Sequence, residues 1–306
     1  MSEPKRIVSV SLGSSKRNAS AQYDVLDQTF LIERIGTDGS MKKMAELFRS
    51  LDGKVDAFGL GGTDLYFKSG DKTFSFRDIK ALVTDNVKST VVLDGSGLKH
   101  TLERQAVLQL EPLIGWKGRK TLMVSAVDRY GMAEALDESG ADLNCGDLIF
   151  GIGVPIDLKG IKALRTFANI LMPVLTQMPF TWFYPTGDKQ ESFVRDWRVK
   201  YYQWADVIAG DFLYINRFRP ERLEGKTILT NTITESDVTM LRASGLRRLI
   251  TTTPKINGRH FATNVMEAFF VVASGKKRPL TTDELLAFIK LIDLKPEVYD
   301  LHTGLG

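Results

Sequence analysis

Short runs rich in β-branched residues alternate with amphipathic stretches along the chain, and this alternation limits its fold more than any other feature. Residues 7–11 and 120–125 contain short apolar runs, as is typical of buried strands. Residues 41–51 place Met44 and Phe48 on one face of a helix. Strands that alternate with helices form parallel sheets joined by crossover helices. We therefore predict an α/β fold.

The length of 306 residues exceeds what one hydrophobic core usually organises, so we predict two domains followed by a C-terminal segment. Residues 1–115 are expected to form an α/β substrate domain. Residues 116–255 contain strand and helix patterns in alternation, which predicts a doubly wound, Rossmann-like nucleotide-binding domain with a parallel sheet. The helices expected in residues 256–306 are predicted to pack across the domain junction.

Cysteine content and the N-terminal residues bear on the cellular location. The single cysteine, Cys145, excludes an intrachain disulfide and therefore favours a reducing compartment. The residues before Ile7 lack the apolar core of a signal peptide. We expect a cytoplasmic protein.

Charge and hydropathy narrow the range of partners. The net charge of +4 comes from 41 basic and 37 acidic residues spread along the chain, which argues against nucleic-acid binding. The most apolar run, residues 167–183, contains Pro173 and Pro179 and falls short of a membrane span. It is expected to be a buried helix end or a subunit contact. In the second case the protein would be a homo-oligomer. The three histidines have no metal-ligand spacing, so no metal site is expected.

The turn at residues 125–131 follows the first strand of the second predicted domain, where an open parallel sheet binds its ligand. Ser125 and Asp128 can cap the next helix, and Arg129 can contact a phosphate. Of the three glycines in a dinucleotide-binding turn only Gly131 is present, and Asp128 would repel a phosphate. The turn therefore predicts a nucleotide site, with a structural turn or a different ligand as alternatives.

Two further residues are candidates for cofactor binding. Asp147 ends the next expected strand, where an acidic side chain would accept hydrogen bonds from an adenosine ribose. It favours NAD over NADP, although NADP is not excluded, and the alternative is an ordinary polar strand end. Thr252 ends the expected strand at 248–252 and would line the same crevice.

Loops at strand ends in the first predicted domain suggest a substrate site. Ser14 and Ser15 could hold a polyol or a carboxylate. Lys99 could form a proton-transfer pair with Asp94 or Asp64, provided that its surroundings lower its pKa, and a surface lysine is the alternative.

Asn264 begins an expected helix near the C-terminus. Its amide could hydrogen-bond a substrate hydroxyl or cap that helix.

Three stretches, residues 98–108 with Lys99, residues 117–124, and residues 258–275 with Asn264 and Phe269, resemble the shikimate/quinate dehydrogenase family. The resemblance implies NAD(P)-linked oxidation of a ring hydroxyl, with Lys99 as acid/base, Ser14 and Ser15 on the substrate, and Asn264 where the family has glutamine. The family's glycine-rich turn and its Asn-Thr-Asp segment are absent.

The leading hypothesis is an NAD(P)-dependent dehydrogenase acting on a small hydroxy acid or carbonyl compound. In such an enzyme the nicotinamide supplies the reactivity and the protein binds, orients and moves a proton. The missing glycines motivate an alternative, a non-catalytic sensor or binding protein for a small ligand. An enzyme of different chemistry on the same scaffold is the third hypothesis.

Overall fold

The computed structural model of the chain describes residues 3–180, 193–253, 255–256 and 259–301. Contacts divide the chain into two units: unit 1 consists of Met1–Leu98, Ile170–Gln190 and Ala262–Ile292, and unit 2 of Lys99–Asn169, Glu191–Phe261 and Asp293–Gly306. This division differs from the predicted boundaries after residues 115 and 255. The first passage between units falls inside α3 (Ser96–Gln109), and the C-terminal helices belong to unit 1.

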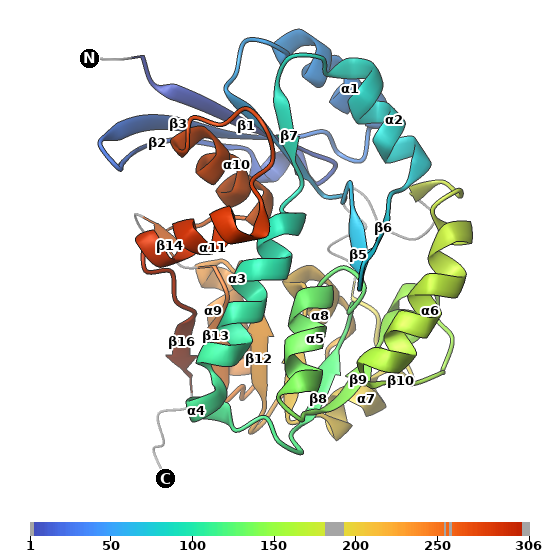
Figure 1. Cartoon of the computed structure of the whole chain (residues 1–306). Helices are drawn as coiled ribbons and strands as arrows, with labels where there is room; N and C mark the ends of the chain where they lie inside the picture. The colour runs from blue at the N-terminus through green and yellow to red at the C-terminus, as the bar shows by residue number, and fades with distance from the viewer. Residues whose placement is uncertain (1–2, 181–192, 254, 257–258, 302–306) are drawn as a thin grey trace. The chain divides into compact units, whose positions relative to one another are not determined.

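Unit 1 is built on a sheet with the strand order β2-β3-β1-β4-β7. Figure 1 labels β1, β2, β3 and β7 of this sheet. Its members are β1 (Lys5–Ser11), β2 (Ala19–Val25), β3 (Gln28–Gly36), β4 (Ala57–Gly61) and β7 (Val91–Leu93). Strand β2 pairs antiparallel with β3, and the other pairings in this sheet are parallel. The apolar run of residues 7–11 predicted a buried strand, and β1 contains it.

Helices cover both faces of the unit 1 sheet. Phe58 of β4 contacts Phe48 of α1 (Met41–Leu51), and the next residue, Gly59, lies against Asn264 of α10 (Thr263–Ala273). Because successive residues of a strand point to opposite faces, α1 and α10 cover opposite sides.

Unit 2 is built on a sheet with the strand order β10-β9-β8-β11-β12-β13-β16. The strands are β8 (Lys120–Met123), β9 (Asp142–Cys145), β10 (Leu158–Lys159), β11 (Val207–Ala209), β12 (Thr227–Thr230), β13 (Arg248–Thr251) and β16 (Glu297–Asp300). The edge strands β10 and β16 run antiparallel to their neighbours, and the others are parallel. The predicted α/β class with parallel sheets is confirmed.

The remaining elements connect these sheets. They are η1 (Ser15–Arg17), β5 (Phe67–Ser69), β6 (Lys72–Phe74), α2 (Arg77–Asn86), α4 (Glu111–Ile114), α5 (Tyr130–Glu138), η2 (Asp147–Gly151), α6 (Gly160–Leu175), α7 (Val199–Trp204), α8 (Phe212–Phe218), α9 (Glu235–Ala243), β14 (Lys255–Ile256), β15 (Arg259–His260) and α11 (Thr282–Leu291). Among the described residues, no helix has the length and apolar character needed to span a bilayer.

Two parts of the sequence discussed above lie outside the described residues. They are the end of the apolar run at 167–183 and Gly258, the first residue of the stretch 258–275.

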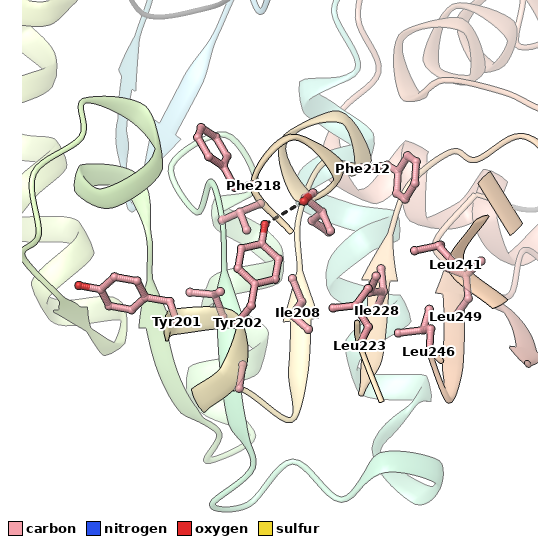
Figure 2. Close-up of a cluster of buried hydrophobic side chains, with 14 of the residues drawn as sticks. Tyr201, Tyr202, Ile208, Phe212, Phe218, Leu223, Ile228, Leu241, Leu246 and Leu249 are labelled. Atoms are coloured by element: carbon pink, nitrogen blue, oxygen red, sulfur yellow. Dashed lines mark hydrogen bonds between the residues drawn. The ribbon is translucent and has the colours of Figure 1, made fainter. Parts of the chain in front are cut away.

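The core of unit 2 gathers aromatic and aliphatic side chains from the strands and from α7, α8 and α9 (Figure 2). Tyr202 is fully buried among them, and its hydroxyl donates a hydrogen bond to the carbonyl oxygen of Ile215 over 2.9 Å. A buried phenol normally has such a partner, because leaving its hydroxyl without one costs free energy. Tyr202 therefore ties α7 to α8.

We predict that Tyr202→Phe lowers the free energy of unfolding by about 1 kcal/mol, because it removes the hydroxyl and leaves the Ile215 carbonyl without this donor. Urea unfolding of the full chain measures the change. Tyr66→Phe, at an exposed tyrosine, is the control and should change the free energy by less than about 0.5 kcal/mol. Equal effects of the two substitutions would contradict the assignment.

Candidate functional site

Polar residues follow the parallel strands of unit 2 at one edge of the sheet. Ser125 to Gly131 come after β8, Asp147 after β9, Asp211 after β11, Asn231 after β12 and Thr252 after β13. Parallel strands end at the same edge, and ligands of open α/β sheets bind there. This carboxyl edge of unit 2 is the candidate site.

Arg129 is the centre of this edge. Its side chain is 2% exposed and forms ion pairs with Glu103 of α3, with Asp211 (Nη2 to Oδ2, 3.0 Å) and with Asp128 (Nε to Oδ2, 3.7 Å). Burial alone would lower the pKa of Arg129, but these carboxylates raise it above its ordinary value. Burial raises the pKa of Glu103, and Arg129 opposes that rise. The guanidinium therefore joins α3, the β8 turn and the β11 turn.

A second buried ion pair lies beside the first. Lys99 Nζ is 2.5 Å from Asp128 Oδ1, and the two side chains are 8% and 10% exposed. Of the predicted partners of Lys99, Asp94 accepts hydrogen bonds from the backbone N–H groups of Leu65 and Ser96, and the pairing of Lys99 with Asp94 or Asp64 stays a prediction. The acid/base role of Lys99 stays a prediction, and its carboxylate neighbour is Asp128.

The turn that was expected to bind a pyrophosphate is occupied by a side chain of the protein. Asp147 accepts hydrogen bonds from the backbone N–H groups of Ala126 (3.1 Å) and Val127 (2.9 Å). Gly131 has a packing role, since an added Cβ would lie 2.8 Å from His100 Cα. The N–H groups of a dinucleotide turn must face the phosphates, and here an internal carboxylate holds two of them.

Burial raises the pKa of Asp147 to about 6, although the two backbone hydrogen bonds work in the opposite direction. The carboxyl therefore changes charge within the mildly acidic range. Tyr214 of α8 shares this electrostatic environment: burial raises the pKa of its phenol, and Asp128, Asp211 and Asp147 raise it further, while Arg217 opposes them.

Hydroxyl groups complete the edge. Within the described residues, the hydroxyls of Ser125 and Thr252 are buried and have no hydrogen-bond partner. Buried polar atoms in native proteins nearly always have a partner, so these hydroxyls represent unused hydrogen-bonding capacity.

The predicted substrate residues lie in unit 1. Ser14 Oγ accepts a hydrogen bond from the backbone N–H of Lys16, and the backbone N–H of Ser15 donates to Asp38. Asn264 is buried and donates to Ser9 Oγ over 3.0 Å, an arrangement that joins α10 to the sheet.

Sequence reasoning missed four residues of the site: Glu103, Asp211, Tyr214 and Asn231. Asp211 and Asn231 follow strands in the same way as Ser125 and Asp147, so the same positional rule would have found them. Glu103 and Tyr214 lie on helices and carry no comparable signal.

The site combines hydrogen-bond donors and acceptors under an excess of acidic groups. Its cations are Lys99 and Arg129, and its carboxyl groups belong to Glu103, Asp128, Asp147 and Asp211. Such an edge favours neutral hydrogen-bonding groups and disfavours a phosphate.

We predict that Arg129→Met destabilises the chain by about 3–5 kcal/mol, because it leaves the buried carboxylate of Glu103 without its cation. Arg129→Met combined with Glu103→Gln removes both charges and should recover a large part of the loss. Urea unfolding of the two variants and the parent tests this. If the single variant is as stable as the parent, the buried pair has no structural role.

We also predict a pH dependence from Asp147. Its pKa is about 6 in the folded chain against an ordinary value of 3.8, which corresponds to about 3 kcal/mol between the two protonation states. The folded state binds this proton more tightly, so the contribution is present below pH 4 and is lost as the pH rises through 6. Unfolding from pH 4 to 7 should show this fall in the parent but not in Asp147→Asn. The exposed Asp142→Asn supplies the background, and identical pH profiles for the parent and Asp147→Asn would refute the prediction.

Solved structures that match the chain are described as sugar-binding proteins. A galactofuranose binding protein matches with 10% identity and a TM-score of 0.39, over 97% of this chain and 95% of that one. The glucose-galactose binding protein GanP from Geobacillus stearothermophilus matches with 9% identity and a TM-score of 0.38, over 98% of each chain. A periplasmic ribose ABC transporter protein from Conexibacter woesei matches with 13% identity and a TM-score of 0.37, over 94% and 95%.

These findings correct several predictions. The resemblance to shikimate/quinate dehydrogenases is wrong, as are the oxidoreductase assignment and the NAD or NADP cofactor, because the matching structures are sugar-binding proteins. The physical reason lies in the β8 turn, where Asp147 holds the N–H groups of Ala126 and Val127.

The predicted cytoplasmic location is also contradicted, since matching structures are described as periplasmic or as ABC transporter solute-binding proteins. These structures are described as binding proteins or transporter components, and the alternative hypothesis of the sequence analysis was a non-catalytic protein that binds a small ligand.

None of the curated proteins matches the sequence. A family model for a domain of unknown function (DUF8753) matches residues 6–94, and another for a domain of unknown function (DUF8754) matches residues 97–301. With the second model covering most of its length, the chain belongs to the DUF8754 family.

Proposed function

We propose that this protein binds a small, neutral, polyhydroxylated molecule at the carboxyl edge of unit 2 and does not transform it. The observation that carries the proposal is the pair formed by Asp211 and Asn231 at the ends of β11 and β12. Asn231 Nδ2 donates to Asp211 Oδ2 over 3.2 Å, and the Asp211 side chain is 25% exposed. The pair places a planar carboxylate beside a planar amide where a ligand can reach the carboxylate.

The pair is oriented before any ligand arrives. Asp211 Oδ2 accepts from Arg129, and its Oδ1 accepts from the backbone N–H of Leu213 over 2.9 Å. Asn231 Oδ1 accepts from the hydroxyl of Thr230 over 3.2 Å. A binding group that folding has already ordered loses little conformational entropy when the ligand binds.

Hydroxyl groups suit this site better than charged groups do. Each ligand hydroxyl can donate to a carboxylate and accept from an amide or hydroxyl of the protein. Asp211 offers remaining lone pairs, and Ser125 and Thr252 have buried hydroxyls whose hydrogen-bonding capacity is unused within the described residues. An anionic ligand would meet Asp128 and Asp211, so a sugar or polyol is the class that we propose.

The strand order supports the placement of the site. In chain order the parallel strands of unit 2 follow the arrangement 2-1-3-4-5, in which the connections reverse direction between β8 and β11. We infer a doubly wound sheet, whose ligand site lies at that reversal. Arg129 and Asp211, which follow these two strands, pair across it.

Titration calorimetry with a panel of neutral aldoses and polyols tests the proposal, with inorganic phosphate and NAD as comparison ligands. At least one neutral compound should bind, and Asp211→Asn should weaken it about tenfold or more, the usual scale for a hydrogen bond to a charged group.

The matched control is Asp206→Asn, because Asp206 precedes β11 at the opposite edge, where its carboxylate accepts from the backbone N–H of Lys120. The control should keep the affinity of the parent. If no neutral compound binds, or if Asp211→Asn and Asp206→Asn behave alike, the proposed site is wrong.

A further inference from the structure

Arg34, near the end of β3 in unit 1, is a half-buried cation whose recorded partners are neutral. Its guanidinium donates to the carbonyl oxygen of Ser14 over 3.1 Å and to Ser11 Oγ over 3.2 Å. Within the described residues, Arg34 forms no ion pair. The neighbouring Glu33 pairs instead with Arg6. A cation withdrawn from water normally has an acidic partner, because its desolvation is costly.

A second arginine adds to this imbalance. Burial and the nearby charge of Arg17 lower the pKa of Arg34 to about 10, and Asp38 only partly opposes them. Arg17 is exposed, and Asp38 accepts a hydrogen bond from the backbone N–H of Ser15 over 2.6 Å. Two guanidinium groups thus lie within electrostatic reach of each other at the end of β1, with a single acidic group opposing the effect on Arg34.

The start of helix α10 lies on the same face of this sheet. Ser9 and Ser11 alternate with Val10 along β1 and therefore share a face. Asn264, in the first turn of α10, donates to Ser9 Oγ, and Arg34 donates to Ser11 Oγ. Helix α10 has no side-chain cap and no acidic residue in its first turn. The positive end of its dipole at this face therefore also favours an anion.

We propose that Arg34 and Arg17 bind an oxyanion, a phosphate or a carboxylate group of a small molecule, at the carboxyl edge of the unit 1 sheet. A guanidinium has five N–H donors, and two of those of Arg34 are used by Ser14 and Ser11, so donors remain for a bidentate contact. Within the described residues neither arginine forms an ion pair with a carboxylate, and a bound anion would provide that negative charge. This site goes beyond the proposed function, because it lies in unit 1 and selects charge where the edge of unit 2 selects neutral hydroxyls.

Thermal unfolding and calorimetry of the full chain test this site with inorganic phosphate and with acetate, each against chloride at the same ionic strength. One of the two oxyanions should raise the melting temperature and bind saturably while chloride does neither. Preference for phosphate or for acetate identifies the source of the anionic group. Arg34→Gln should abolish this binding. Equal responses to all three anions would overturn the site.

Arg17→Gln separates binding from folding, because Arg17 is exposed and its side chain forms no hydrogen bond or ion pair within the described residues. It should keep the melting temperature of the anion-free chain and weaken anion binding about threefold to tenfold. Arg49→Gln, at an exposed arginine of α1, is the control and should bind like the parent. Unchanged anion binding in both Arg34→Gln and Arg17→Gln would overturn the proposal, whatever the sugar titrations of unit 2 show.

Discussion

The ion pairs of Arg129 are the interaction on which the edge of unit 2 depends. A fully buried guanidinium is tolerated only when carboxylates surround it, and Glu103, Asp128 and Asp211 do so. These partners come from a helix, from the turn after β8 and from the turn after β11. One charge therefore connects three segments that are distant in sequence. Because removing Arg129 would leave the buried carboxylate of Glu103 without its cation, the positions of the three segments are energetically linked.

Asp147 shows how a turn in the position of a nucleotide site can exclude a nucleotide. Its carboxylate takes two backbone N–H groups of the β8 turn, and burial raises its pKa to about 6. The protein thus supplies its own anion where a phosphate would otherwise bind. The edge keeps the position at which open α/β sheets bind their ligands, but the groups left for a ligand are a carboxylate, an amide and hydroxyls. The strand order thus predicts where a ligand binds, and the Asp147 carboxylate determines which ligands the turn can accept.

Local patterns in the sequence predicted the helices that have one buried face and the strands that are buried on both faces. The amphipathic pattern that includes Met44 and Phe48 predicted α1, and the apolar runs predicted β1 and β8. Strands β2 and β16 were missed because their polar sequences gain their structure from a neighbouring strand. The turn at 125–131 was found from its position, but the pairs of Lys99 with Asp128 and of Glu103 with Arg129 join residues 29 and 26 positions apart. Such pairs follow from the fold and leave no periodic signal.

The two units balance charge in different ways, and this difference bears on what each can bind. In unit 2 the cations Lys99 and Arg129 are matched by surrounding carboxylates, so a charged ligand would have to displace an existing partner. In unit 1 Arg34 has only neutral acceptors recorded, so an anion could contact it without breaking an ion pair. Displacing a buried partner costs several kcal/mol, whereas contacting an open guanidinium costs mainly the desolvation of the anion. Binding therefore costs the least free energy when the ligand at the edge of unit 2 is neutral and the ligand at the edge of unit 1 is an anion.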